Sequence, residues 1–347
     1  MKRVLNRATN VLCGSKLKRA VVASVAAASS SALPRLPVPD LHKSVQRFLR
    51  VSKPILSAQD YDTTEKIAQK FSSPGGEGEK LIALLQERAT QRENWLDEWW
   101  WTAAYLDQRC PLPISIPNPG WLYRKLNFSG KQEQLDVAAN MTRGYLSYRD
   151  MLTSKMDEPD LDKNKNPLES NQYWLMFGTS RIPGLEHDKM RFGRFETVNH
   201  KHVTVAHNGH LFKVDVLDSN DKPLSVAQLK HQFDSVLRQS DSRNDRPLAL
   251  ATSEERPVWA KLYQRLKESP RNTEHLEDLE TALFVVCLDE EAPSDSVSSF
   301  GQQLMHGGGS QSNSANRWFD KTLQLREDLF HQPREVVVLL ARKGNSC

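Results

Sequence analysis

The chain has 347 residues, of which 38% are apolar and 26% are charged, and its net charge at pH 7 is +4. A chain of this size and composition can bury a sizeable core in one large domain or two ordinary ones. Residues 1–39 hold seven cations and no acid, so the rest of the chain carries a net charge of −3. That body lacks the clustered cations of a protein that follows nucleic-acid phosphates, and we expect no nucleic-acid partner.

Residues 1–33 are basic, acid-free and rich in Ala and Ser, which is typical of a mitochondrial presequence. The short apolar run at residues 20–28 fits a secretory signal less well, and a disordered basic tail is the alternative. We therefore predict a mitochondrial location, on the matrix or inner-membrane side, with the peroxisome or endoplasmic reticulum left open for other isoforms. No later apolar run reaches the roughly 18 residues that a membrane span needs, so we predict no transmembrane segment.

Helices are predicted through residues 34–90, after an entry segment with prolines at positions 34, 37 and 39. The first helix should break near Pro54, because proline has no amide hydrogen to donate. The glycine-rich stretch SPGGEGEK (73–80) lacks the Lys-Ser/Thr pair of a phosphate-binding loop. It is therefore interpreted as a turn before a helix.

The stretch ENWLDEWWWTAAYLDQR (93–109) holds four of the eight tryptophans. Regular helical spacing predicts one broad face made by Trp95, Leu96, Trp99, Trp100, Ala103 and Leu106. Trp101 and Tyr105 would then lie toward the other side. Composition alone favours a core over a binding pocket for such a cluster.

Strands and helices alternate after residue 200. Apolar residues alternate with polar ones on both sides of Asn208-Gly209, which is a hairpin turn pair. Ser225 is predicted to cap a helix, and residues 282–289 (ALFVVCLD) are predicted to form a buried strand with Cys287 in the core. Residues 171–184 (NQYWLMFGTSRIPG) should pass from a helix into a turn. This order predicts an α/β domain.

Neither cysteines nor histidines show a metal-ligand spacing. Cys13, Cys110, Cys287 and Cys347 are far apart, which predicts neither a zinc site nor a disulfide framework. His202 and His207 have opposite parity on one predicted strand and should face opposite ways. We therefore expect no metal.

His306 is followed by three glycines, a pattern that helps to form the oxyanion hole of lipases and esterases. That function requires a G-x-S-x-G nucleophile elbow, which this sequence lacks. The glycines instead predict a close approach of the backbone to a neighbouring group.

Several segments, taken in order, resemble the choline/carnitine acyltransferase family over about Leu33–Gln324. They are LPRLPVPDL, ENWLDEWW followed by AAYL, NQYW followed by SRIPG, PLSVAQL, FVVCLD and LMHGGGSQSNSANRWFDKTLQ. Within the family, ENWLDEWW and NRWFDKTLQ look closest to members that use carnitine rather than choline.

This resemblance implies an α/β fold similar to chloramphenicol acetyltransferase, with coenzyme A and carnitine as substrates and no permanently bound cofactor. Residues 34–90 would be a helical segment of the family's first domain, and residues 91–324 an incomplete α/β acyltransferase domain. Trp100 and Tyr105 match an aromatic pair that lines the family's carnitine pocket. Arg317 and Asp320 are interpreted as structural polar anchors.

The family's general-base histidine comes a strand later, in a pattern like YEHAAAEG, whereas the resemblance stops at Gln324. We therefore assign no catalytic residue: His306 comes before that position, and His331 follows NRWFDKTLQ too early. Residues 325–347 are expected to be a divergent tail.

Three functions stay open on the sequence: a truncated and inactive carnitine-using enzyme, a non-catalytic binding or regulatory isoform, and a choline-using protein. Acyl-chain length is not readable. Exposed apolar faces on helices 34–90 predict self-association.

Overall fold

The computed structural model describes residues 33–112, 120–124, 130–154, 160–169, 173, 175–193, 200–290, 302, 306–308, 311–327 and 336–340. The predicted presequence, apart from residue 33, lies outside the described residues, as do His331 and most of the predicted tail. The chain divides into two compact units, Met1–Tyr105 (unit 1) and Leu106–Cys347 (unit 2). The predicted boundary at residue 90 stays a prediction.

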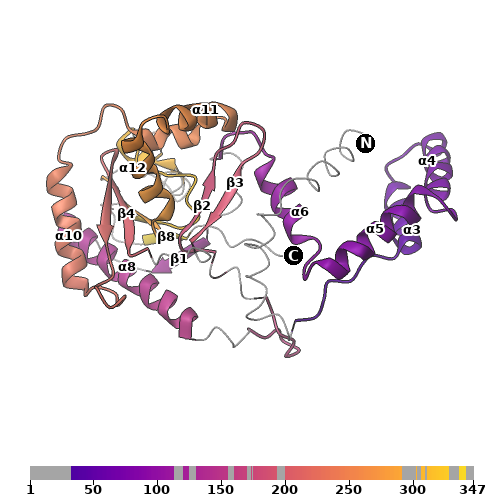
Figure 1. Cartoon of the computed structure of the whole chain (residues 1–347), viewed down its shortest axis with the longest axis horizontal. Helices are drawn as coiled ribbons and strands as arrows, with labels where there is room; N and C mark the ends of the chain where they lie inside the picture. Colours follow the sequence, from indigo (N-terminus) through magenta and orange to yellow (C-terminus); the bar gives the residue numbers. More distant parts are fainter. Residues whose placement is uncertain are drawn as a thin grey trace. The chain divides into compact units, whose positions relative to one another are not determined.

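Unit 1 contains the helices α3 (Leu41–Ser52), α4 (Ala58–Phe71) and α5 (Glu77–Gln91), and α3 contacts both of the others (Figure 1). Asp40 caps α3 by accepting a hydrogen bond of 2.8 Å from the Lys43 amide. The helix ends two residues before Pro54, as predicted. Ser57 caps α4 in the same way, through the amide of Asp60.

Apolar side chains of unit 1 are mostly exposed. Among its described residues, only Ala68 and Trp95 count as buried apolar side chains. The exposed ones on or beside the three helices are Phe48, Val51, Ile55, Ile67 and Leu84. The predicted exposed faces are therefore present, while self-association stays a prediction.

Unit 2 is built on a four-stranded sheet with the order β5-β4-β6-β7. Strands β4 (His202–His207) and β5 (His210–Asp215) form the predicted antiparallel hairpin. Its turn residues Asn208 and Gly209 have φ angles of 51° and 76°, which suit this residue pair. Strands β6 (Val285–Leu288) and β7 (Gln324–Glu327) continue the sheet in parallel with β4.

Helices cover both faces of this sheet (Figure 1). On one face lie α8 (Lys131–Ser154) and α10 (Val226–Gln239), and on the other lie α11 (Arg256–Leu266) and α12 (Pro270–Thr281). Alternate residues of β6 serve the two cores: Val286 and Leu288 join the first, and Val285 and Cys287 join the second. The predicted α/β class and the buried Cys287 are confirmed.

Shorter elements complete unit 2. They are β1 (Gly120–Arg124) paired with β8 (Val336–Leu340), β2 (Thr179–Ile182) paired with β3 (Lys189–Phe192), the 3₁₀-helix η5 (Leu248–Ser253) and α14 (Gln311–Ser314).

The turn predicted within residues 171–184 is wrong for Thr179–Ile182, which form strand β2. The Gly178 amide donates to the Leu283 carbonyl at 2.9 Å, and the Arg181 amide donates to the Asp320 carbonyl at 2.7 Å. These contacts with distant residues hold the backbone extended before the Pro183-Gly184 turn signal takes effect.

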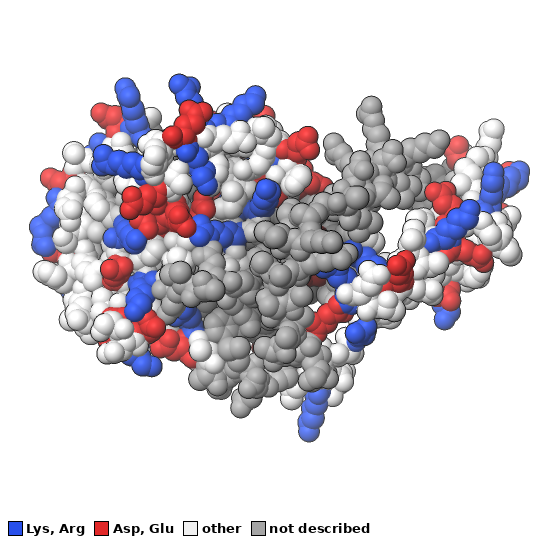
Figure 2. All heavy atoms as spheres, viewed as in Figure 1, with Lys and Arg blue, Asp and Glu red and all other residues white. Residues whose placement is uncertain are grey.

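Charged side chains of both signs are interspersed on the face of unit 2 that Figure 2 shows. No helix among the described residues is both long enough and apolar enough to cross a membrane.

Candidate functional site

The tryptophan-rich segment of unit 1 is not one regular helix. The short helix α6 (Asp97–Trp101) continues as a π-helix, η3 (Thr102–Leu106). π-Helices are rare and often occur at functional sites. The predicted single apolar face is therefore wrong. Trp100 and Tyr105, which regular spacing places on different sides, have ring centroids 6.4 Å apart in an edge-to-face arrangement.

These two candidate site residues present an aromatic surface rather than a core. The Trp100 side chain is 48% exposed, and Tyr105 also lies 5.8 Å from the Trp101 ring. Aromatic ring faces attract quaternary ammonium groups through their negative electrostatic potential. The arrangement can therefore bind a cationic head group.

Trp95 and Trp99 have a structural role instead. Trp95 is buried, and its indole nitrogen donates to the Leu36 carbonyl at 3.1 Å. The Arg88 side chain of α5 donates to the Trp95 carbonyl at 2.8 Å, and its guanidinium lies 4.3 Å from the centroid of the Trp99 ring. The core role favoured by composition therefore applies to Trp95 but not to Trp100.

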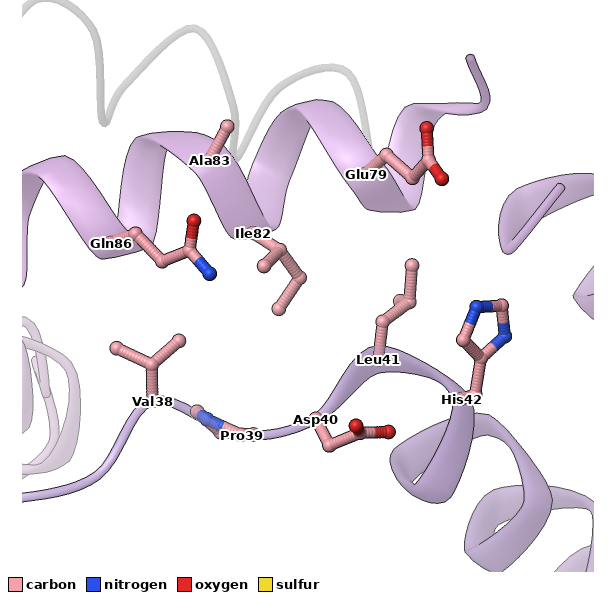
Figure 3. Close-up of a pocket in the computed structure, with 9 residues that line it drawn as sticks. All are labelled: Val38, Pro39, Asp40, Leu41, His42, Glu79, Ile82, Ala83 and Gln86. Carbon is pink, nitrogen blue, oxygen red and sulfur yellow. The ribbon is translucent and has the colours of Figure 1, made fainter. Parts of the chain in front are cut away.

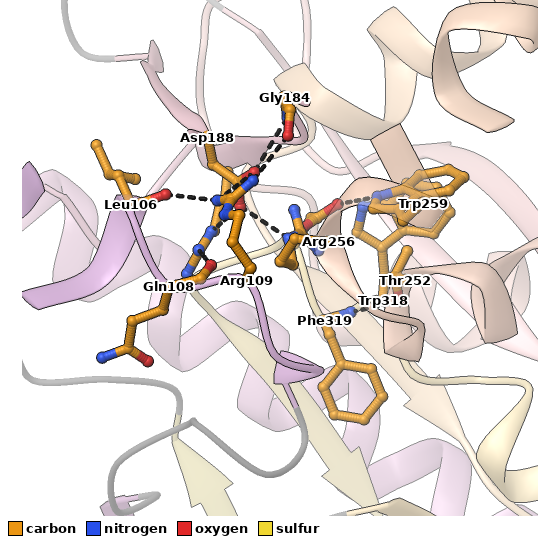
Figure 4. A network of polar contacts seen from close by, with 12 residues as sticks. Leu106, Gln108, Arg109, Gly184, Asp188, Thr252, Arg256, Trp259, Trp318 and Phe319 are labelled. Atoms are coloured by element: carbon orange, nitrogen blue, oxygen red, sulfur yellow. Dashed lines mark hydrogen bonds and ion pairs between the residues drawn. The ribbon is translucent and has the colours of Figure 1, made fainter. Parts of the chain in front are cut away.

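Unit 2 contains a buried ionic cluster around Asp188 (Figure 4). Arg109 and Arg256 approach its carboxylate at 3.0 and 2.7 Å, and Arg181 forms a third ion pair with it. Burial alone would raise the pKa of Asp188, but Arg256 and Arg181 hold it below its ordinary value. The carboxylate therefore stays charged and joins three separate segments of the chain.

Arg256 extends this cluster to a second carboxylate. Its Nη2 lies 2.7 Å from Oδ1 of Asp320, and the other oxygen, Oδ2, accepts a hydrogen bond of 2.6 Å from the Trp259 indole. Burial raises the pKa of Asp320 to about 6, although Arg256 and Trp259 favour its charged form. The predicted role of Asp320 as a polar anchor agrees with these contacts.

The cluster also fixes the backbone at the end of η3. The Leu106 carbonyl accepts hydrogen bonds from the Asp188 amide at 3.0 Å and from the Arg109 side chain. Sequence reasoning missed Arg109, Arg181, Asp188 and Arg256, which are far apart in the chain and show no local periodicity.

Arg317 forms a second buried ion pair, with Asp289 just after β6. The two guanidinium nitrogens bind the two carboxylate oxygens, one at 2.8 Å. Both side chains are inaccessible to solvent. Bidentate geometry of this kind gives strong, oriented pairs, so Arg317 is the structural anchor that the sequence predicts.

The strand histidines face opposite sides of the sheet, as predicted. His202 Nε2 lies 2.8 Å from the Asp278 carbonyl of α12, and burial lowers its pKa so that the ring stays neutral near pH 7. His207 lies between Ser240, at the end of α10, and Glu290, at 2.8 and 2.9 Å. Among the described residues, no three potential metal ligands come together.

Gly307, the first glycine after His306, permits a close backbone approach, as predicted. Gly307 has a φ angle of 85°, and a Cβ atom there would lie 2.3 Å from the Ser314 amide nitrogen. The Ser314 hydroxyl donates to the His306 carbonyl at 2.7 Å. This part of the chain is a tight structural turn rather than an oxyanion hole.

A pocket of about 420 Å³ in unit 1 lies between α5 and the segment that enters α3 (Figure 3). The side chains of Leu41 and Ile82 point into it from opposite sides. Its carboxylates are already engaged: Asp40 binds the Lys43 amide and Glu79 binds the Gly75 amide. His42 and Gln86 also line the pocket, so its wall is mixed polar and apolar.

Comparison with known proteins bears on the aromatic pair. The family model described as "Choline/Carnitine o-acyltransferase" matches residues 36–326. The chain is 38% identical to carnitine O-acetyltransferase of Rattus norvegicus over 86% of its own length and 48% of that protein. It is 37% identical to carnitine O-acetyltransferase of Homo sapiens, over 86% and 48% of the two chains. Identity to human choline O-acetyltransferase is 32%, over 89% and 42%.

The chain thus spans about half the length of the curated relatives it matches. The matched region includes the aromatic pair, the Asp188 cluster and the Arg317–Asp289 pair. On this match, the chain belongs to the choline/carnitine acyltransferase family.

Proposed function

We propose that this chain carries the carnitine-binding aromatic pair of a protein that moves acyl groups between coenzyme A and carnitine. The observation that carries the proposal is the exposed Trp100 ring, which the π-helix brings together with Tyr105. The trimethylammonium group of carnitine is the chemistry that such ring faces attract. The higher identity to carnitine than to choline acetyltransferases supports carnitine as the acyl acceptor.

The test is carnitine binding to the purified chain by titration calorimetry. Replacing Trp100 with Ala removes one cation–π partner, whose contribution of about 1–2 kcal/mol corresponds to an affinity loss of roughly five- to thirtyfold. Trp99→Ala is the matched control, because Trp99 lies in the same helix with 43% exposure and packs on Trp95 and Arg88 instead. Equal losses in both variants would contradict the assignment, and tighter binding of choline than of carnitine would point to the choline-using branch.

We further propose that this chain alone does not transfer acyl groups. General-base catalysis requires a side chain within about 3 Å of the reacting hydroxyl. The two buried histidines do not offer a free base, since His202 is bonded to a carbonyl and His207 to Ser240 and Glu290. On this proposal the chain acts as a carnitine-binding module, and neither His202 nor His207 serves as its general base.

An assay with acetyl-coenzyme A and carnitine, following free thiol release, tests this proposal. We expect no turnover above background. Turnover that disappears on His331→Ala would overturn the proposal and make His331 the base. Turnover that survives that change would show that another group in this chain serves as the base.

For location we propose mitochondrial import directed by residues 1–33, on the grounds of their basic, acid-free composition. A fluorescent protein fused after residues 1–40 should enter mitochondria. A fusion that stays in the cytosol would refute this part of the proposal.

A further inference from the structure

The first helix of unit 1 combines exposed apolar side chains with unpaired cations. Residues 41–59, which include α3, contain no acid. Phe48, Val51 and Ile55 are 52%, 56% and 81% exposed. Lys43, Arg47, Arg50 and Lys53 are also exposed, and among the described residues none of these cations forms an ion pair.

Helical spacing arranges these side chains in adjacent stripes. At 100° per residue, Leu41, Val45, Leu49 and Ser52 share the face that is buried or half-buried in unit 1. Phe48 and Val51 lie beside that face, and Arg47 and Lys43 follow next around the helix. The apolar stripe thus has the protein on one side and a row of cations on the other.

Among the described residues, no acid of the two neighbouring helices forms an ion pair with this row. On α4, Asp62 pairs with Lys66 at 2.6 Å, and Asp60 accepts a hydrogen bond from Ser57 at the helix cap. On α5, Glu79 accepts from the Gly75 amide. Positive charge in these helices is therefore concentrated on α3.

We propose that α3 is a membrane-surface contact that recognises anionic phospholipids. An amphipathic helix with Lys or Arg beside an apolar stripe lies in the plane of the membrane interface, where its apolar side chains enter the acyl boundary and its cations meet lipid phosphates. Charge complementarity favours this occupant over an apolar protein face, which would offer the four cations no anion. The contact is peripheral and reversible, because only three apolar side chains are available to insert.

The test is co-sedimentation of the full chain with vesicles of phosphatidylcholine alone or with about one third phosphatidylglycerol. We expect binding only to the acidic vesicles, and weaker binding as the salt concentration rises. Arg47→Gln/Arg50→Gln should weaken binding about 25-fold, since each cation near an anionic surface contributes about fivefold. Phe48→Ser should also weaken binding, and all three positions are exposed enough to leave the fold intact.

Lys70→Gln/Lys80→Gln is the matched control, because it removes the same charge from exposed sites on α4 and α5. If both double variants lost the same amount of vesicle binding, net charge alone would explain the effect, and the proposal would be overturned. Binding that survives in the α3 variant but is lost in Lys16→Gln/Lys18→Gln would assign the lipid contact to residues 1–32 instead. Absence of vesicle binding, together with an oligomer that dissociates on Phe48→Ser, would make a second copy of the chain the occupant.

Discussion

The helices of unit 1 and those of unit 2 both carry apolar side chains, but these side chains meet different surroundings. Phe233 of α10 is inaccessible to solvent beneath the sheet, whereas Ile67 of α4 is 64% exposed. The difference arises because unit 2 has a sheet whose two faces each accept a helix layer, while the described residues of unit 1 include no strand for its helices to pack on. The packed core of unit 2 therefore stabilises that unit, whereas unit 1 has exposed apolar surface that is available for contacts.

The largest expected difference between the two units comes from replacing one apolar side chain in each unit with alanine. Phe233→Ala should lower the free energy of unfolding of unit 2 by about 3–5 kcal/mol, because it leaves a cavity in a packed core. Ile67→Ala should change the stability of unit 1 by no more than about 0.5 kcal/mol. Hydrogen exchange followed by mass spectrometry resolves the two units. Similar losses in both would show that unit 1 has a core that its exposed surface does not reveal.

The second test uses the buried carboxylate Asp320. Its folded-state pKa of about 6 lies above its ordinary value of 3.8, so the folded state holds the proton more tightly than the unfolded state does. This contribution to stability is fully present below about pH 4 and is lost as the pH rises through about 6. The loss is on the order of 3 kcal/mol.

The difference in unfolding free energy between the natural chain and Asp320→Asn should therefore fall as the pH rises from about 4 to about 7, because His202, whose pKa is lowered, contributes equally to both chains. Asp188 has a lowered pKa, so its contribution is lost only as the pH falls below about 4, outside this window. Parallel profiles for the variant and the natural chain would refute the raised pKa.

The smallest expected effect compares one helix cap in each unit. Ser225 and its partner Gln228 form a reciprocal capping box on α10, and Ser57 caps α4 through the Asp60 amide. Ser225→Ala should cost about 1 kcal/mol in the unfolding of unit 2. Ser57→Ala should mainly raise amide exchange in α4, because unit 1 has little packing to transmit the change. Global destabilisation by Ser57→Ala would show that unit 1 unfolds as one cooperative body.

Local patterns in the sequence predicted much of unit 2. The Asn208-Gly209 turn, the Ser225 cap and the buried strand around Cys287 each depend on neighbouring residues, and each is present. The resemblance also led to Arg317 and Asp320, whose partners Asp289 and Arg256 are distant in sequence.

Two features of the site were not predictable from local patterns. The π-helix at Thr102–Leu106 changes the number of residues per turn, so a calculation at regular spacing separates Trp100 from Tyr105. The Asp188 cluster unites residues from four segments between positions 109 and 320. Only the tertiary fold brings these charges together, and no single segment carries a signal for them.

The position of β6 has a consequence for how the protein folds. This strand pairs with β4, about 80 residues earlier, and with β7, about 40 residues later. Contacts between such distant residues form slowly, because a long loop must close before the pairing contributes any free energy. During synthesis, β4 and β5 can pair as soon as they leave the ribosome, but β6 keeps one open edge until Gln324–Glu327 has been made. The last strand of the sheet to be synthesised therefore sets the earliest moment at which the four-stranded sheet can close.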